Sequence, residues 1–130
     1  MFDYIIFGDV LEHLRRPDKA IEYCKSLLKN YGCIIASIPN LMHISVMEDL
    51  LKGNFTYRET GLLDKTHIHF FTYNEIIRMF RDNGYRITNI TTIIHKITEE
   101  QRTLIDQLTS IYDSPHFMYE TFQYIISAQK

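Results

Sequence analysis

The sequence has 130 residues, 45% of them hydrophobic and 23% charged, a composition typical of one globular domain with its own core. The formal net charge of −2 argues against a nucleic-acid-binding surface, which would need a basic patch or stripe. No apolar run approaches the roughly 20 residues that span a membrane. Two cysteines, with no leader peptide before the first predicted strand, indicate reduced thiols in a cytoplasmic protein.

The first third of the chain predicts a strand, a helix and a second strand. Phe2–Phe7 is a short apolar run ended by Gly8, which favours a buried strand. Pro17 suits the start of a helix, and the apolar residues that follow it recur at helical spacing. Cys33–Ile38 is a second apolar run. The short connections predict a βαβ unit with parallel strands.

The rest of the chain continues the alternation. Leu41–Leu51 has helical spacing, and residues 54–68 are predicted to form an irregular loop over the strand ends. Thr72 and Glu75 have the spacing of a capping box at the start of the next helix. The predicted order ends with a helix at Tyr73–Asn83, a strand at Tyr85–Ile94, a helix at Thr98–Asp113 and a strand within Phe117–Ala128. This alternation indicates an α/β sheet with helices on both faces.

Four sequence blocks occur in an order that resembles class I S-adenosylmethionine-dependent methyltransferases. The blocks are FDYIIFGDVLEHL, ASIPN, GLLDKTHIHFFT and FRDNGY, and the resemblance covers roughly Phe2 to Ile93. It is greatest to the bacterial branch found beside or fused to glycosyltransferases in surface-polysaccharide gene clusters. The resemblance implies a partial Rossmann-like methyltransferase sheet, with the family's strands in the order 4-5-7-6 and the last strand antiparallel.

Part of the family pattern has no counterpart in this sequence. The family's glycine-rich turn after its first strand and the acidic residue ending its second strand contact the methionine part and the ribose of the cofactor. The resemblance therefore implies that residues 1–130 are a single domain, the C-terminal half of a methyltransferase domain, and that this truncated form binds S-adenosylmethionine weakly or not at all. Phe2–Phe7 would then be an uncovered sheet edge, so we expect a homodimer or larger homo-oligomer that covers it.

The residues that follow the first strand are the candidate cofactor site. Ligands of open α/β sheets bind beyond the carboxyl ends of the strands, and a glycine there lets a ligand approach the backbone. By the resemblance, Gly8, Asp9 and Val10 lie near the transferable methyl group. The alternative is that Gly8 only makes a turn.

His13 and His67 are the candidate catalytic residues, because a hydroxyl nucleophile benefits from a general base. We expect no metal. The alternative is a divalent cation held by Asp9, Glu12 and His13, which lie close together if the turn is helical. A similar set is thought to bind a cation in some quinone-biosynthesis O-methyltransferases. Structural roles are the other possibility: Glu12 capping backbone amides, His13 packing under the loop and His67 fixing that loop.

Asn40, Tyr57 and His69 are the candidate substrate-binding residues. Asn40 follows the second strand, Tyr57 lies in the loop, and His69 stands where the family usually has a basic residue and points to the same side as His67 if that segment is extended. Asn40 could instead end the strand by a local backbone bond, and Tyr57 could belong to the core. His43 and the later histidines look incidental.

The resemblance implies S-adenosylmethionine-dependent methyl transfer to a small-molecule or saccharide acceptor, most simply to an oxygen atom, with no nucleic-acid or membrane partner. Whether the isolated chain is an enzyme is left open. The alternative function is a non-catalytic α/β module for oligomerisation or partner binding. A rise in melting temperature on cofactor addition would separate the two, because a ligand that binds only the native state stabilises it.

Overall fold

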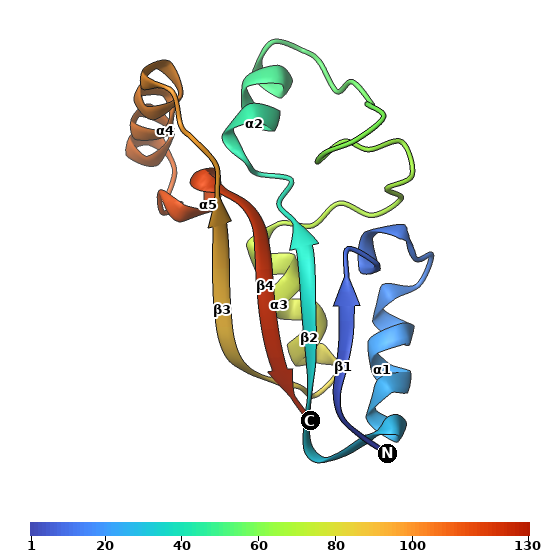
Figure 1. Ribbon diagram of the computed structural model, residues 1–130. Coiled ribbons are helices and arrows are strands. Elements are labelled where there is room, and N and C mark those ends of the chain that lie inside the picture. The colour runs from blue at the N-terminus through green and yellow to red at the C-terminus, as the bar shows by residue number, and fades with distance from the viewer.

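Four strands form one open sheet in the computed structural model, which describes all 130 residues (Figure 1). The strands are β1 (Phe2–Gly8), β2 (Leu28–Pro39), β3 (Arg86–Ile94) and β4 (Thr121–Gln129). Their order across the sheet is β1-β2-β4-β3. β1 is parallel to β2, and β4 is antiparallel to both of its neighbours. The α/β class, the parallel first pair and the antiparallel last strand are confirmed, whereas the assignment to the family's strands 4-5-7-6 stays a prediction.

Helices connect the strands. They are α1 (Pro17–Leu27), α2 (Ile44–Leu51), α3 (Tyr73–Asp82), α4 (Glu99–Ile111) and the short α5 (Phe117–Glu120), with one 3₁₀ turn, η1, at Leu11–His13. The predicted loop over residues 54–68 contains no helix or strand. The strand predicted within Phe117–Ala128 is β4, and the residues before it form α5. No helix is both long enough and apolar enough to cross a bilayer.

The predicted capping box at α3 is wrong. The Thr72 side chain makes no hydrogen bond to the start of α3, and Glu75 is paired with Arg78 instead. A complete capping box stands at the start of α4, where Thr98 and Gln101 bond each other's backbone N–H groups at 3.1 Å. The capping-box pattern occurs at Thr72 and again at Thr98, and only the copy at Thr98 forms its two hydrogen bonds.

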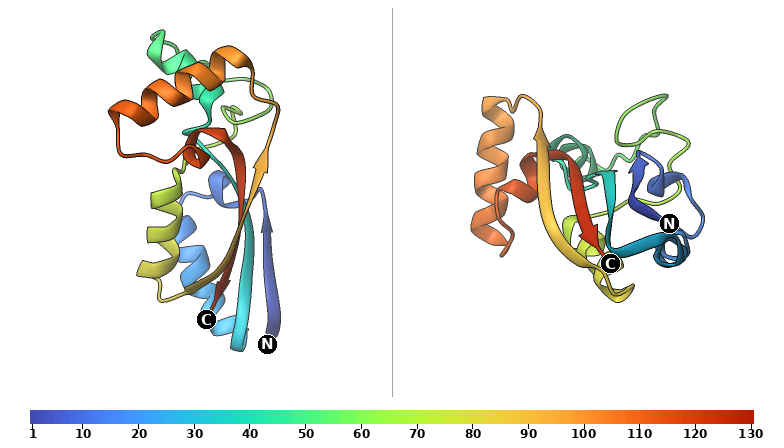
Figure 2. Two further views of the ribbon diagram at one scale, coloured as in Figure 1. Left: turned by 90° about the vertical axis from the view of Figure 1, so that its left-hand side faces the viewer. Right: turned by 60° about the horizontal axis from the view of Figure 1, so that its bottom comes forward.

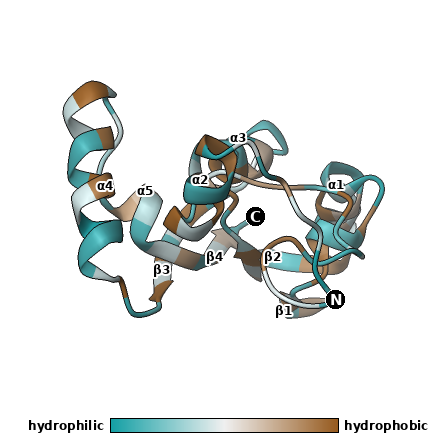
Figure 3. Ribbon diagram, turned by 90° about the horizontal axis from the view of Figure 1, so that it is seen from above, coloured by the Kyte–Doolittle hydropathy of each residue, from teal (hydrophilic) through white to brown (hydrophobic).

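The main core lies on one face of the sheet, which differs from the expected cover on both faces. Ile21 of α1 and Phe80 of α3 pack against the same strand residues, and both helices lie on the same side (Figure 2). The view along the strands shows no helix over the other side (Figure 3). The reason is topological: β1, β2 and β3 follow one another in a single direction across the sheet, so right-handed crossovers return on one face.

The uncovered face carries apolar side chains of the edge strand. Phe2, Tyr4 and Ile6 alternate along β1 and are 56%, 63% and 71% exposed. Their neighbours Ile5 and Phe7 point to the opposite side and pack against the main core. β1 therefore has a free edge and an exposed apolar face.

A second layer lies beyond the carboxyl ends of β1 and β2. There α2, α4 and α5 bury Ile44, Ile105, Leu108 and Tyr119 in a small separate cluster. The loop of residues 54–71 passes over the same end of the sheet (Figure 1). This arrangement places η1, the end of β2 and the loop around one space.

Candidate functional site

The turn after β1 is exposed and held by side-chain bonds. Asp9 adopts a left-handed backbone conformation, with φ of 52°. Its backbone N–H donates to Ser37 Oγ at 3.0 Å, and that hydroxyl donates to Asp9 Oδ1 at 3.2 Å. A Cβ on Gly8 would meet no heavy atom within 4 Å, so the backbone is open to a ligand there. Val10 is 37% exposed. The predicted cofactor residues thus lie together on an accessible turn.

Glu12 is the most unusual residue at this end of the sheet. It lies in η1 and is 1% exposed, yet neither of its carboxylate oxygens has a hydrogen-bond partner. Its backbone carbonyl accepts from the N–H groups of Ile68 and His69, at 2.9 and 3.1 Å. These two bonds dock the loop onto η1, and they bring His67 to the Glu12 side chain.

Two histidines face the Glu12 carboxylate. Nε2 of His13 lies 3.8 Å and Nε2 of His67 lies 3.9 Å from Glu12 Oε1. The two imidazole rings meet edge to face, with centroids 4.8 Å apart. The other ring nitrogens are occupied: His13 Nδ1 bonds the Thr66 carbonyl at 3.1 Å, and His67 Nδ1 bonds the Leu62 carbonyl at 3.0 Å. We call Glu12, His13 and His67 the histidine–glutamate cluster.

The bonds to the Thr66 and Leu62 carbonyls determine which ring nitrogen of each histidine carries a proton. A carbonyl oxygen only accepts, so each Nδ1 carries a proton, and in a neutral imidazole the lone pair then lies on Nε2. Distances of 3.8 and 3.9 Å are too long for hydrogen bonds to Glu12. Burial raises the pKa of Glu12, as does the negative charge of Asp9, whereas the residue's own backbone N–H and the two histidines act to lower it. Two nitrogen lone pairs and one carboxylate therefore converge without a donor between them.

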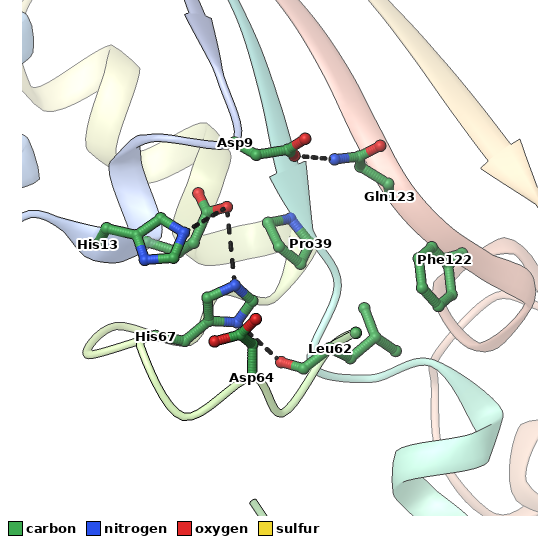
Figure 4. Close-up of a pocket in the computed structure, with 10 residues that line it drawn as sticks. Asp9, His13, Pro39, Leu62, Asp64, His67, Phe122 and Gln123 are labelled. Atoms are coloured by element: carbon green, nitrogen blue, oxygen red, sulfur yellow. Dashed lines mark hydrogen bonds and ion pairs between the residues drawn. The ribbon is translucent and has the colours of Figure 1, made fainter. Parts of the chain in front are cut away.

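The cluster borders a cavity of about 320 Å³ (Figure 4). Asp9 and Gln123 lie on one side of the cavity, and Asp64 and His67 lie on the other. The space adjoins the turn at Asp9 and could accommodate one small polar group. It is the position that a methyl acceptor would occupy if a cofactor lay against the Gly8–Val10 turn.

The predicted substrate-binding residues do not line this cavity, whereas the predicted catalytic residues His13 and His67 do. Asn40 is fully buried, and its amide is used internally: Nδ2 donates to the carbonyls of Met118 and Thr121 at 2.8 and 2.7 Å, and Oδ1 accepts from the Met42 N–H at 3.0 Å. The prediction that Asn40 orients substrate is therefore replaced by a structural role. Its side chain joins β2 to α5 and β4.

Tyr57 and His69 also lie away from the cavity. Tyr57 is 50% exposed and packs with Phe55 and Phe70 on the outer side of the loop. His69 Nε2 bonds the Arg15 carbonyl at 3.0 Å, which helps to fasten the loop to the turn after η1. Neither residue borders the cavity beside Asp9, so their assignment to acceptor binding needs a larger acceptor that extends over the loop.

The sequence reading missed two polar residues at the site. Gln123 of β4 donates a hydrogen bond to Asp9 Oδ1, and Asp64 borders the cavity, its pKa lowered by hydrogen bonds from Thr66. Gln123 carries no local sequence signal, because it approaches Asp9 only through the antiparallel insertion of β4 beside β2. Asp64 belongs to the block GLLDKTHIHFFT, but its position relative to the other polar residues gave no reason to select it.

The residues able to hold a cation differ from the alternative set of Asp9, Glu12 and His13. The ligand atoms of Glu12, His13 and His67 all lie within 4.8 Å of one another. Asp9 is engaged by Ser37 and Gln123 instead. Cys24 and Cys33 are free thiols and lie in other parts of the fold.

Comparison with known proteins defines the class of this fold. A family model described as "Methyltransferase domain" matches residues 1–90. Among curated proteins, none is significantly similar in sequence. Solved structures do match: a methyltransferase dependent on S-adenosylmethionine (SAM) from Archaeoglobus fulgidus has a TM-score of 0.59 at 16% identity over 99% of this chain. One from Thermotoga maritima, described as a possible histamine N-methyltransferase, has a TM-score of 0.64 at 16% identity over 99% of this chain.

The chain belongs to the methyltransferase domain family. Magnesium protoporphyrin IX methyltransferase from Synechocystis, solved with bound SAH, is a further structural match, with a TM-score of 0.57 at 17% identity over 99% of this chain. The chain spans 59%, 56% and 45% of the length of these three structures. At such identities the likeness concerns the fold, and residues 1–130 correspond to part of it.

Proposed function

We propose that this chain is the acceptor-side part of a SAM-dependent methyltransferase that acts on a hydroxyl oxygen of a small-molecule or saccharide acceptor. The observation that carries the proposal is the histidine–glutamate cluster beside the turn at Gly8–Val10, with both Nε2 lone pairs directed at one space. Membership of the methyltransferase domain family supports the reaction class. The resemblance of four sequence blocks supports the branch associated with polysaccharide gene clusters, and a cytoplasmic location goes with it.

The chemistry follows from the position of the lone pairs. Methyl transfer from a sulfonium is an in-line displacement, so the protein has to orient the nucleophile and exclude water. An acceptor hydroxyl in the cavity would lie within reach of His67 Nε2, which is buried and free to take the hydroxyl proton. His13, on the more exposed side, would orient the same hydroxyl. The oxygen would bond to the methyl carbon as the carbon–sulfur bond breaks.

The test is methyl transfer from radiolabelled S-adenosylmethionine to pools of nucleotide sugars and glycans. It compares this chain alone with the chain extended by its upstream coding region. We expect activity in the extended form and a loss of at least about a hundredfold in kcat for His67→Gln. His116→Gln is the matched control, because that histidine pairs with Asp106 on the surface. An extended His67→Gln enzyme with unchanged kcat would remove His67 from the reaction.

The exposed edge of β1 supports a second candidate function, a module that associates through this strand. β1 pairs only with β2, and Phe2, Tyr4 and Ile6 are exposed on its uncovered face. An unprotected apolar edge of this kind is a template for pairing with another chain. Sedimentation velocity at tens of micromolar should show a dimer or larger species that Ile6→Lys dissociates. Ile111→Lys, at an equally exposed position on α4, is the control. A monomer for the unaltered chain would contradict this candidate.

A further inference from the structure

The buried Glu12 carboxylate lacks a partner that the protein itself could supply. A buried carboxylate oxygen left without a hydrogen bond destabilises the fold, because the hydration it loses on burial is not replaced. The nearest polar atoms are the Nε2 atoms of His13 and His67, which present lone pairs instead of protons when the rings are neutral. Three acceptors that converge on one space, with the Glu12 carboxylate buried, favour a cation between them.

We propose that Glu12, His13 and His67 bind a divalent transition-metal ion such as Zn²⁺. Two imidazole nitrogens and one carboxylate form a donor set known from catalytic zinc sites, in which a fourth position stays open. Ligand atoms about 2.1 Å from a tetrahedral ion lie about 3.4 Å apart. The two histidines lie 3.8 and 3.9 Å from Glu12, and the whole set lies within 4.8 Å, so side-chain shifts of up to about 1.4 Å bring the ligand atoms to this spacing.

The surroundings of the two histidines fit a ligand role. A metal-bound histidine usually donates its second ring N–H to a carbonyl or carboxylate, which fixes the ring and its tautomer. His13 does so to Thr66 and His67 does so to Leu62, both in the loop that Glu12 itself holds through its backbone carbonyl. The loop thus supplies one ligand and orients both rings.

The open coordination positions would face the cavity of about 320 Å³. A cation there would hold the acceptor hydroxyl and lower its pKa, and in the metal-bound form the ion would replace His67 as the group that activates the hydroxyl. An acceptor with a second oxygen next to that hydroxyl would chelate the ion, which points to vicinal diols or hydroxy acids. This extension to the acceptor rests on the proposed function, whereas metal binding does not.

Metal binding is tested on the chain as it is, with no cofactor or acceptor present. Co²⁺ is titrated while its visible absorption is followed, and Zn²⁺ and Mg²⁺ are titrated calorimetrically. We expect Zn²⁺ and Co²⁺ to bind with a Kd on the order of micromolar, and Mg²⁺ to bind far more weakly because imidazole prefers the transition metals. Glu12→Gln and His67→Gln should weaken Co²⁺ binding at least tenfold. His116→Gln should leave it unchanged.

Thermal unfolding gives a second readout that a merely structural role would not produce. Without metal, Glu12→Gln should melt at or above the temperature of the unaltered chain, because it removes an unpartnered buried charge. With Zn²⁺ in excess the order should reverse, since only the unaltered chain gains binding energy. Absence of Co²⁺ binding up to millimolar concentration, binding that survives both substitutions, or no reversal of the melting order would each overturn the proposal. None of these outcomes depends on methyl transfer.

Discussion

Gln123 donates a side-chain hydrogen bond to the carboxylate of Asp9, and this bond links the turn after the edge strand to β4, which lies beyond β2 in the sheet. Ser37 of β2 bonds the same aspartate through its hydroxyl. Asp9 is thus held from two neighbouring strands in a backbone conformation that non-glycine residues seldom adopt. The candidate cofactor turn has its shape fixed by side chains instead of by a glycine.

This arrangement predicts that the Asp9→Gly variant is more stable than the Asp9→Ala variant, although glycine ordinarily destabilises a folded chain relative to alanine. Asp9→Ala loses the bonds to Ser37 and Gln123 and keeps a Cβ at φ of 52°, so it should destabilise the fold by about 2 kcal/mol. Asp9→Gly loses the same bonds but relieves the backbone strain, and it should be about 1 kcal/mol more stable than the alanine variant. Urea denaturation of both variants measures the difference. Equal stabilities would mean that the turn relaxes out of the left-handed region.

A substitution of Asn40 tests whether its side chain stabilises the fold, as the structure indicates, instead of binding substrate. Asn40→Ala removes three hydrogen bonds of a fully buried side chain, one of them buried and two partly buried, so the free energy of unfolding should fall by about 3 kcal/mol. Asn89→Ala is the control, because Asn89 is exposed and its amide bonds only Thr91. Urea midpoints that fall equally for both variants would contradict the structural assignment of Asn40.

His43 makes stability dependent on pH. Its ring accepts the Ser45 N–H at the start of α2, and burial, helped by the charge of His95, lowers its pKa to about 4 from an ordinary value of 6.5. Between pH 6.5 and 4 the unfolded chain therefore binds a proton that the folded chain does not, and stability should fall as pH falls. The loss should reach about 3 kcal/mol at pH 4.

The matched variant for this prediction is His43→Asn, which keeps a side-chain acceptor at the helix start and cannot titrate. Glu12 has a raised pKa and opposes the trend in the unaltered chain and in the variant alike, so the difference between their pH profiles isolates His43. Parallel profiles from denaturant titrations at pH 7, 5.5 and 4 would show that His43 is not the titrating group.

Cofactor affinity should be low for residues 1–130 on their own. Only the turn at Gly8–Val10 corresponds to an expected cofactor contact, while the family's glycine-rich turn and acidic strand end have no counterpart in this sequence. We expect calorimetry with S-adenosylmethionine to give a Kd weaker than about 100 µM, equivalent to roughly 5 kcal/mol of binding. A low-micromolar Kd would require a binding mode that the open turn alone does not explain.

The strands and helices were predictable because their signals are local. Phe2–Phe7 and Cys33–Ile38 are short, largely apolar runs bounded by turn residues, which favours strands, although the first is more exposed than the expected buried strand. Capping was less predictable, since Thr72 and Thr98 have equally suitable partners and only tertiary packing decided which box closed. The prediction that helices cover both faces of the sheet was wrong for a similar reason. The face on which a helix packs depends on the direction of successive crossovers across the sheet.

At the candidate site, the sequence identified Asp9, Glu12, His13 and His67 but not their grouping, and it missed Gln123 and Asp64. Asp9, Glu12 and His13 are neighbours along the chain, so the alternative to the expectation of no metal was a cation held by these three residues on one turn. The structure turns Asp9 toward Gln123 and replaces it by His67, which arrives on the loop through backbone bonds to the Glu12 carbonyl. This contact depends on the backbone carbonyl of Glu12 and on the path of the loop that carries His67. Neither can be inferred from the types of the residues.

The central place of β4 in the sheet bears on how the chain is made. Its nine residues follow β3 along the chain, yet β3 pairs with the rest of the sheet only through them. During translation β1, α1 and β2 can assemble early, whereas β3 can join the sheet only after β4 has been made and has inserted between β2 and β3. A premature stop that removes these residues would leave the nascent product split into an incomplete β1–β2 unit and an unattached β3, a natural substrate for chaperones and proteases.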